Sequence, residues 1–161
     1  MIGILNYGLG NIRAFMNVFN RLNVSLKLVS RADELDAIKK LILPGVGAFD
    51  HAMRLFNNSG LRDKVEQMVL IDGVPIIGIC VGMQMMAAGS EEGKEPGLNW
   101  IKGFVKKFDV NAIPFKPKLP HMGWNEVEIL KESGLFESIQ DKSRFYFLHS
   151  YYFDCVNQEN I

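Results

Sequence analysis

The stretch Val74-Pro-Ile-Ile-Gly-Ile-Cys80 is followed directly by Val81-Gly-Met-Gln84, and this junction decides the fold of the chain. Its first part is almost continuously apolar, which is typical of a strand buried on both faces of a parallel sheet. The residues after Cys80 have the composition of a helix, and we expect that helix to run from about Val81 to Ala88. The junction therefore predicts a buried strand that turns abruptly into a helix at Cys80.

Shorter segments of the same two kinds precede this junction. Apolar runs that read as strands lie at 2–6, 24–29 and 40–43. Amphipathic helices are expected between them, with apolar faces formed by Ile12, Phe15, Met16 and Phe19, by Phe49, Met53 and Phe56, and by Leu61, Val65, Met68 and Val69. Asn11 can cap the first of these helices. Apolar strands that alternate with amphipathic helices indicate a parallel sheet covered on both faces.

The second half of the chain has a different pattern. Segments 104–108, 126–129 and 145–148 read as strands joined by long loops. We therefore predict an α/β fold with a parallel core and some antiparallel additions. A chain of 161 residues suits a single domain over 1–161, since a chain near this size buries roughly 70% of its unfolded surface.

Composition argues against several classes of protein. The 18 basic and 18 acidic side chains balance, so there is no electrostatic footprint for nucleic acid. The most apolar stretch, from Gly73 to Gly89, is shorter than the ~20 residues of a membrane span, and no charged leader suggests secretion. Two cysteines and three scattered histidines show no metal-ligand spacing. We expect a reduced cytoplasmic protein without a metal or other cofactor.

Cys80 is the candidate nucleophile. Gly78-Ile-Cys-Val-Gly82 is the cysteine version of the G-x-S-x-G elbow, which holds its nucleophile in a strained turn between strand and helix. The alternative is that Cys80 is a small buried apolar residue, as free cysteines often are. Acyl transfer also needs donors for an oxyanion, such as the amide of Val81 and one from the glycine turn at 43–49. That turn can equally be an ordinary connection between a strand and a helix.

Six short motifs occur in one order along the chain: Asn6-Tyr-Gly-Leu-Gly-Asn11, Leu43-Pro-Gly-Val-Gly-Ala-Phe49, Gly78-Ile-Cys-Val-Gly-Met-Gln84, Ser90-Glu-Glu-Gly93, Leu119-Pro-His-Met-Gly-Trp-Asn125 and Phe145-Tyr-Phe-Leu-His-Ser-Tyr151. Together they closely resemble the amidotransferase subunits of imidazole glycerol phosphate synthases, which are class I glutamine amidotransferases. The resemblance covers essentially the whole chain and implies a flavodoxin-like sheet. It also implies that glutamine is hydrolysed to glutamate and ammonia through a thioester.

The resemblance assigns site residues motif by motif. Cys80 is the nucleophile, and Gly47 and Val81 flank the oxyanion site. The glutamine head group would be held by Gln84, Glu92, Ser150 and Tyr151. Gln84 can also be an ordinary helix residue, and Glu92 can lie in a solvated charged loop.

The resemblance also implies a partner. Subunits of this kind pass ammonia to a (β/α)₈-barrel cyclase in a heterodimer that makes imidazole glycerol phosphate for histidine synthesis. His121 and Trp124, in a loop, and Tyr146 would face that partner. His121 is less convincing as a catalytic base.

One family feature is missing from the chain. Class I amidotransferases complete their triad with a His-x-Glu motif near the C-terminus, and no such motif occurs in these 161 residues. We therefore expect the sequence to be incomplete at its C-terminal end, lacking the strands and final helix of the family. If it is whole, we expect weak activity, because general acid–base help is worth roughly 10²- to 10⁴-fold.

Three other functions are open at this point. Gly8-x-Gly10 suggests a dinucleotide-binding turn, but Arg13 occupies the third glycine position. The missing base favours a non-catalytic subunit that only binds its partner. A related subunit that supplies ammonia for surface-sugar synthesis would share the motifs around Cys80, because those motifs read glutamine and not the acceptor.

Overall fold

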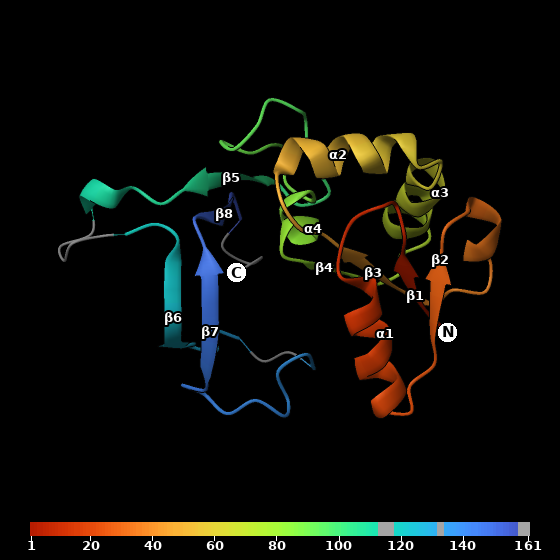
Figure 1. Ribbon diagram of the computed structural model, residues 1–161, viewed down its shortest axis with the longest axis horizontal. Helices are drawn as coiled ribbons and strands as arrows, with labels where there is room; N and C mark the ends of the chain where they lie inside the picture. The colour runs from red at the N-terminus through yellow and green to blue at the C-terminus, as the bar shows by residue number, and fades with distance from the viewer. Residues whose placement is uncertain (113–117, 132–133, 158–161) are drawn as a thin grey trace.

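The computed structural model describes residues 1–112, 118–131 and 134–157, and its core is a parallel sheet (Figure 1). The sheet consists of β1 (Ile2–Leu5), β2 (Leu26–Val29), β3 (Lys40–Pro44) and β4 (Ile76–Ile79). Their order is β2-β1-β3-β4, and every neighbouring pair is parallel. This is the flavodoxin-like order, in which ligands bind at the carboxyl ends of the strands. The prediction of a parallel core is confirmed.

Helices cover both faces of the sheet. Figure 1 shows α1 (Ile12–Arg21) on one side of the strands and α2 (Phe49–Asn58) on the other. The face covered by α2 also holds α3 (Arg62–Glu66), which continues into a π-helical turn, η2 (Gln67–Ile71). A 3₁₀ turn, η1 (Ala32–Leu35), connects β2 with β3. Because neighbouring residues of a strand point to opposite faces, Ile4 packs under α1 and Leu5 under α2.

The two faces are buried to different degrees. The α2 face includes fully buried Phe49, Met53 and Phe56, together with Leu61 and Val65 from the helix that follows. On the α1 face, the predicted apolar residues of the helix do pack against the sheet, but none is fully buried. Leu28 and Ile77, which point to the same face as Ile4, remain 41% and 42% exposed.

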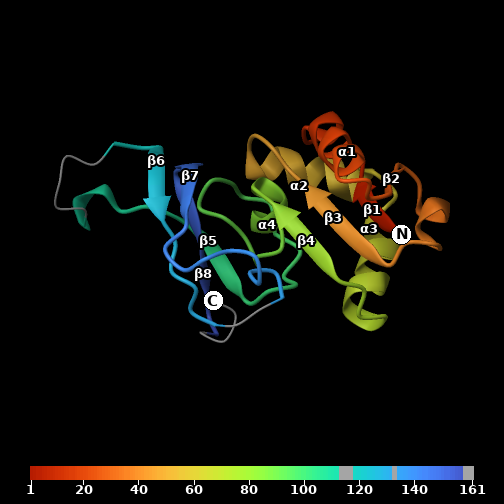
Figure 2. The ribbon, with the colours of Figure 1, turned by 90° about the horizontal axis from the view of Figure 1, so that it is seen from below.

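The second half forms two antiparallel pairs. β5 (Gly103–Lys107) pairs with β8 (Tyr151–Cys155), and β6 (His121–Glu126) pairs with β7 (Arg144–His149). A 3₁₀ turn, η3 (Val110–Ala112), follows β5. Figures 1 and 2 show both pairs to one side of the parallel sheet, beyond β4 and α4. The antiparallel additions are thus separate ribbons, which no strand joins to the parallel sheet within the described residues.

The helix after Cys80 is shorter than predicted. α4 spans only Val81–Gln84, because the chain at 97–101 returns and takes the carbonyl groups that a longer helix would use. The amide of Leu98 donates to the carbonyl of Met85, and the amide of Asn99 donates to that of Ala87. Asn11 does occupy the N-cap of α1, but its side chain makes no capping hydrogen bond.

The prediction of a strand at 126–129 is also wrong, because the strand lies earlier in the chain. The strand is β6, so the segment around His121 and Trp124 that we expected to be a loop is extended and paired. The strand β8, which follows β7 after Ser150, was missed. Across the described ranges, no helix is long and apolar enough to cross a membrane.

Candidate active site

Cys80 lies between β4 and α4 in a backbone conformation that L-residues rarely adopt. Its φ is 55° and its ψ is −121°, and its side chain is exposed and not oxidised to a disulfide. A non-glycine residue held in this region costs about 1–3 kcal/mol and persists only where the surrounding structure enforces it. The thiol therefore stands at a strained strand-to-helix turn, as the elbow pattern predicts.

The glycine turn after β3 lies in backbone contact with this elbow. A Cβ on Gly45 would overlap the backbone nitrogen of Gly82, and a Cβ on Gly82 would overlap the carbonyl oxygen of Leu43. Glycine at both positions is what allows the two backbones to approach so closely. The contact brings the turn that contains Gly47 next to Val81.

The two predicted oxyanion donors have suitable local geometry. Val81 is the first residue of α4, where a backbone N–H has no carbonyl one turn earlier to bond to. Gly47 has a φ of 84° and is exposed, with open space where a Cβ would stand. Neither amide donates a hydrogen bond among the described residues, so both can donate to a carbonyl oxygen bound beside Cys80.

Gln84 lies one helical turn after Cys80 and is only 9% exposed. Within the part of the chain that the structure describes, its amide makes no hydrogen bond to another protein group. The amide atoms are not among the buried unpaired polar atoms of the described residues, so they reach solvent at the edge of the site. An amide in this position is suited to hold a small polar ligand next to the thiol.

Glu92 is bonded to the start of α2. Its Oε2 accepts a hydrogen bond from the backbone N–H of Phe49 at 2.9 Å. In return Asp50 Oδ1 accepts hydrogen bonds from the amides of Lys94 and Glu95, each at 2.9 Å. The loop at 90–95 is thereby fastened to the helix that begins just after Gly47, and it is not a free solvated loop. Sequence reasoning missed Asp50, which lies directly after Phe49, the last residue of the glycine-rich motif at 43–49.

Tyr151 belongs to the same neighbourhood. It pairs with Lys107 across the β5–β8 ribbon, and the amide of Lys107 donates to Glu91 Oε2 at 2.7 Å. Burial raises the pKa of the Tyr151 phenol, and the negative charges of Glu92 and Glu91 raise it further. Ser150, the residue before it, accepts a hydrogen bond through its carbonyl from the amide of Phe108. The charge of Glu92 therefore acts on the Tyr151 phenol across this part of the site.

The three residues predicted to face a partner separate into two groups. Trp124 and Tyr146 are opposite one another on β6 and β7, with ring centroids 5.8 Å apart, and they are 60% and 52% exposed. His121 points to the other face of this ribbon, because it is three residues away on the same strand. There its ring contacts Phe147 and His149 at 5.6 and 5.5 Å.

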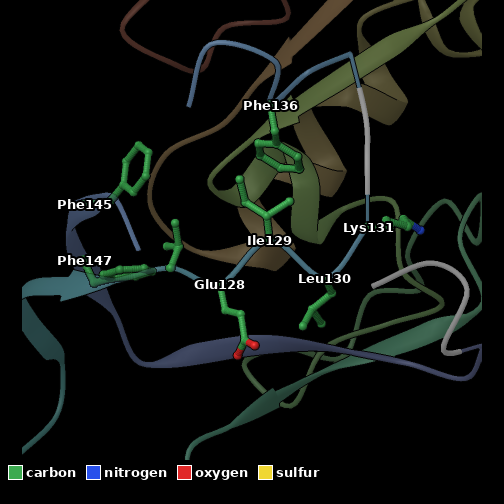
Figure 3. A pocket seen from close by; sticks show the side chains of 8 residues that line it. Glu128, Ile129, Leu130, Lys131, Phe136, Phe145 and Phe147 are labelled. Atoms are coloured by element: carbon green, nitrogen blue, oxygen red, sulfur yellow. The ribbon is translucent and has the colours of Figure 1, made fainter. Parts of the chain in front are cut away.

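The β6–β7 ribbon also borders an apolar hollow of about 460 Å³. Figure 3 shows Phe136 and Ile129 facing one another across it, while the Glu128 carboxylate points away. Phe145 and Phe147 close another side. None of the residues that line it is a predicted site residue, so this hollow is separate from the surroundings of Cys80. Nowhere in the described ranges do three or more metal-ligating side chains gather.

Comparison with known proteins identifies relatives along the whole chain. The glutamine amidotransferase class-I family pattern matches residues 4–161. The imidazole glycerol phosphate synthase subunit HisH of Bdellovibrio bacteriovorus is 51% identical, over 99% of this chain and 78% of its own length. The protein of the same name from Leptospira borgpetersenii is 45% identical, over 100% of this chain and 79% of its own length.

The fold is shared with solved structures. A crystal structure of glutamine amidotransferase superposes with a TM-score of 0.71 at 21% identity, covering 98% of this chain and 75% of that one. At this level of identity the likeness concerns the fold alone. It agrees with the parallel sheet and the helices on both of its faces.

Proposed function

Because this chain belongs to the class-I glutamine amidotransferase family, we propose that it is the glutaminase subunit of an imidazole glycerol phosphate synthase and that Cys80 is its nucleophile. The observation that carries the proposal is the strained, exposed Cys80 at the carboxyl end of β4. Relatives at 51% and 45% identity bear this subunit's name, which favours histidine synthesis over surface-sugar synthesis.

The chemistry begins with attack of the Cys80 thiolate on the side-chain carbonyl carbon of glutamine. A C–S bond forms, and the carbonyl electron pair moves onto oxygen, which the amides of Val81 and the Gly47 turn stabilise. When this intermediate collapses, the C–N bond breaks and the nitrogen leaves with a proton as ammonia. Water then attacks the thioester, which releases glutamate and restores the thiolate.

The remaining assignments concern the head group of glutamine. Gln84 and Glu92 hold the polar groups of the glutamine head, because one offers an unpaired amide and the other a carboxylate oxygen not bonded to Phe49. Tyr151, whose phenol feels the charge of Glu92, and Ser150 are proposed to make further contacts with the substrate.

Ammonia passes to a (β/α)₈-barrel cyclase that docks on Trp124 and Tyr146. An exposed indole and phenol in mutual contact are the side chains that protein interfaces favour. His121 supports this surface from behind the ribbon. The proposed reaction needs no cofactor. We further propose that the heterodimer works in the cytoplasm.

The proton acceptor is the remaining component. We propose that the histidine and glutamate of the triad lie outside these 161 residues, because no His-x-Glu occurs among them and the matched relatives are longer. The intact mass of the protein from its native source is then above 18.2 kDa. A mass of 18.2 kDa would contradict this part of the proposal.

The function as a whole is tested by complementation. A bacterial strain that lacks this subunit is grown without histidine and at low ammonium, so that glutamine must supply the nitrogen. The native gene and a Cys155→Ala variant are expected to restore growth, and Cys80→Ala is not. Growth with Cys80→Ala equal to that with the native gene would refute Cys80 as the nucleophile. Failure of the native gene would refute the assignment to histidine synthesis.

A further inference from the structure

Tyr7 joins three elements that surround the elbow. It follows β1 and is 5% exposed. Its ring stands edge-on to Phe56 of α2, with centroids 5.4 Å apart. Its hydroxyl donates a hydrogen bond to the carbonyl oxygen of Pro44, the last residue of β3, and lies 3.5 Å from the sulfur of Met85 after α4.

Pro44 is a sensitive point for the site. It pairs with Ile79, the residue before Cys80, and the glycine turn with Gly47 begins directly after it. The backbone of Gly10 also packs closely against Pro44, since a Cβ on Gly10 would lie 2.7 Å from Pro44 Cβ. The peptide between Pro44 and Gly45 is therefore held by the Tyr7 hydroxyl, by the Gly10 backbone and by the contact of Gly45 with Gly82.

We infer that Tyr7 is a positioning residue for the oxyanion site: its hydroxyl orients the Pro44 carbonyl and so fixes the turn that contains Gly47 against the elbow. This inference rests on the proposed function. A buried hydroxyl that donates to a buried carbonyl is rigid, and burial raises the pKa of Tyr7, so the group stays a neutral donor. Catalytic donors lose most of their effect when they are displaced, and loss of one typically costs 10²- to 10³-fold in kcat.

The test uses two reagents on the native protein in complex with its cyclase. Iodoacetamide alkylates a thiolate by displacement at carbon and needs no oxyanion donor. The second reagent is a glutamine analogue in which a chloromethyl ketone replaces the side-chain amide. It first forms a tetrahedral adduct, whose oxyanion needs the backbone donors of the oxyanion site. In Tyr7→Phe we expect the ketone to label Cys80 about tenfold more slowly, with iodoacetamide labelling unchanged. The kcat for glutamine should fall by a similar factor, with KM within about twofold.

Two control variants separate positioning from general damage. Tyr152→Phe removes the hydroxyl of an exposed tyrosine that stacks on Phe108. Met85→Leu removes the sulfur near the Tyr7 hydroxyl but keeps the hydrogen bond from that hydroxyl to the Pro44 carbonyl. Both should label at the native rate with both reagents. Amide hydrogen exchange at Val46 and Gly47 should become faster in Tyr7→Phe only.

The outcomes are distinguishable. Equal ketone labelling of native protein and Tyr7→Phe would overturn the inference and leave the proposed function intact. Equal slowing with both reagents, or a Tyr7→Phe protein that does not melt cooperatively, would also overturn it, because Tyr7 would then serve the fold in general. If the ketone does not label Cys80 in the native protein, the proposed function fails, and the inference fails with it.

Discussion

Glu92 accepts a hydrogen bond from the backbone N–H of Phe49, 43 positions earlier in the chain, at 2.9 Å. The carboxylate thus caps the N-terminus of α2, where a negative charge is favourable, and fixes the loop at 90–95 beside the glycine turn. The same side chain is proposed to bind glutamine through its other oxygen. A residue with two such roles can be dissected by variants that keep one of them.

Glu92→Gln should separate the cap from the ligand contact. A glutamine carbonyl can still accept from Phe49, so the free energy of unfolding should change by less than about 0.5 kcal/mol. The KM for glutamine should rise roughly tenfold or more, since hydrogen bonds to charged groups contribute about 1.5–3 kcal/mol. Steady-state kinetics and urea unfolding measure the two effects. Glu91 accepts an equivalent hydrogen bond from the amide of Lys107. Glu91→Gln is therefore the control and should leave the KM for glutamine unchanged.

The same pair of variants tests whether Glu92 and Tyr151 are neighbours. The negative charges of Glu92 and Glu91 add to the effect of burial in raising the pKa of Tyr151. Glu92→Gln should therefore lower the pKa of that phenol, by more than Glu91→Gln does, in an ultraviolet titration with Tyr152→Phe as background. If neither substitution changes the pKa of the Tyr151 phenol, Tyr151 does not belong to the glutamine pocket.

Strain at Cys80 predicts an unusual stability series. Glycine adopts a φ of 55° and a ψ of −121° easily, whereas alanine does not. Cys80→Gly should therefore be more stable than Cys80→Ala by about 1 kcal/mol in urea unfolding, although both lack glutaminase activity. At Cys155, in the strand β8, the order should be reversed, because glycine weakens a strand. An alanine variant at position 80 that equals the glycine variant would mean that the elbow is not strained.

The bonds of Asp50 to the loop at 90–95 should depend on pH. The hydrogen bonds from the amides of Glu95 and Lys94 lower the pKa of the Asp50 carboxyl. A depressed pKa means that the stabilisation is present above the ordinary aspartate pKa, near 3.9, and is lost as the pH falls through the lower folded value. Amide chemical shifts of Lys94 and Glu95 should then titrate together below about pH 4. In Asp50→Asn the two amides should show no common transition.

Much of this fold could be predicted because its signals are local. Apolar strands and amphipathic helices in the first hundred residues gave the parallel sheet, and the pattern around Cys80 gave the strained turn. The end of α4 could not be predicted, since it depends on amides of residues 97–101 that return from a distance. The strand β6 was displaced from its predicted place because we expected the segment around His121 and Trp124 to be a loop, and its extended form depends on pairing with β7.

The site was predicted unevenly for the same reason. Residues within one motif, such as Cys80 and Gln84, are placed by helical geometry alone. The neighbourhood of Glu92 and Tyr151 depends on pairing between β5 and β8, and β8 was not foreseen. The contribution of Tyr7 requires knowing that β1 and β3 are adjacent, which no spacing in the sequence reveals.

The exposed aromatic pair predicts how the partner binds. Trp124→Ala or Tyr146→Ala should raise the Kd for the cyclase subunit by a factor of about 30 or more, as loss of a central interface anchor does. Labelling of Cys80 by iodoacetamide in the free subunit should be unaffected. Ile71→Ser, which replaces an apolar residue exposed on η2, is the control for calorimetry. Native affinity in both aromatic variants would place the partner elsewhere.

The most direct test of the central claim is to trap the intermediate. The native complex is mixed with glutamine and quenched in acid within milliseconds, and its peptides are analysed by mass spectrometry. The account predicts a γ-glutamyl group on the peptide that contains Cys80. Neutral hydroxylamine should remove this group, as it does a thioester, and no thioester should form in Cys80→Ser. A γ-glutamyl group found on Cys155 or on any other side chain, with glutamate still being released, would contradict the claim that Cys80 is the nucleophile.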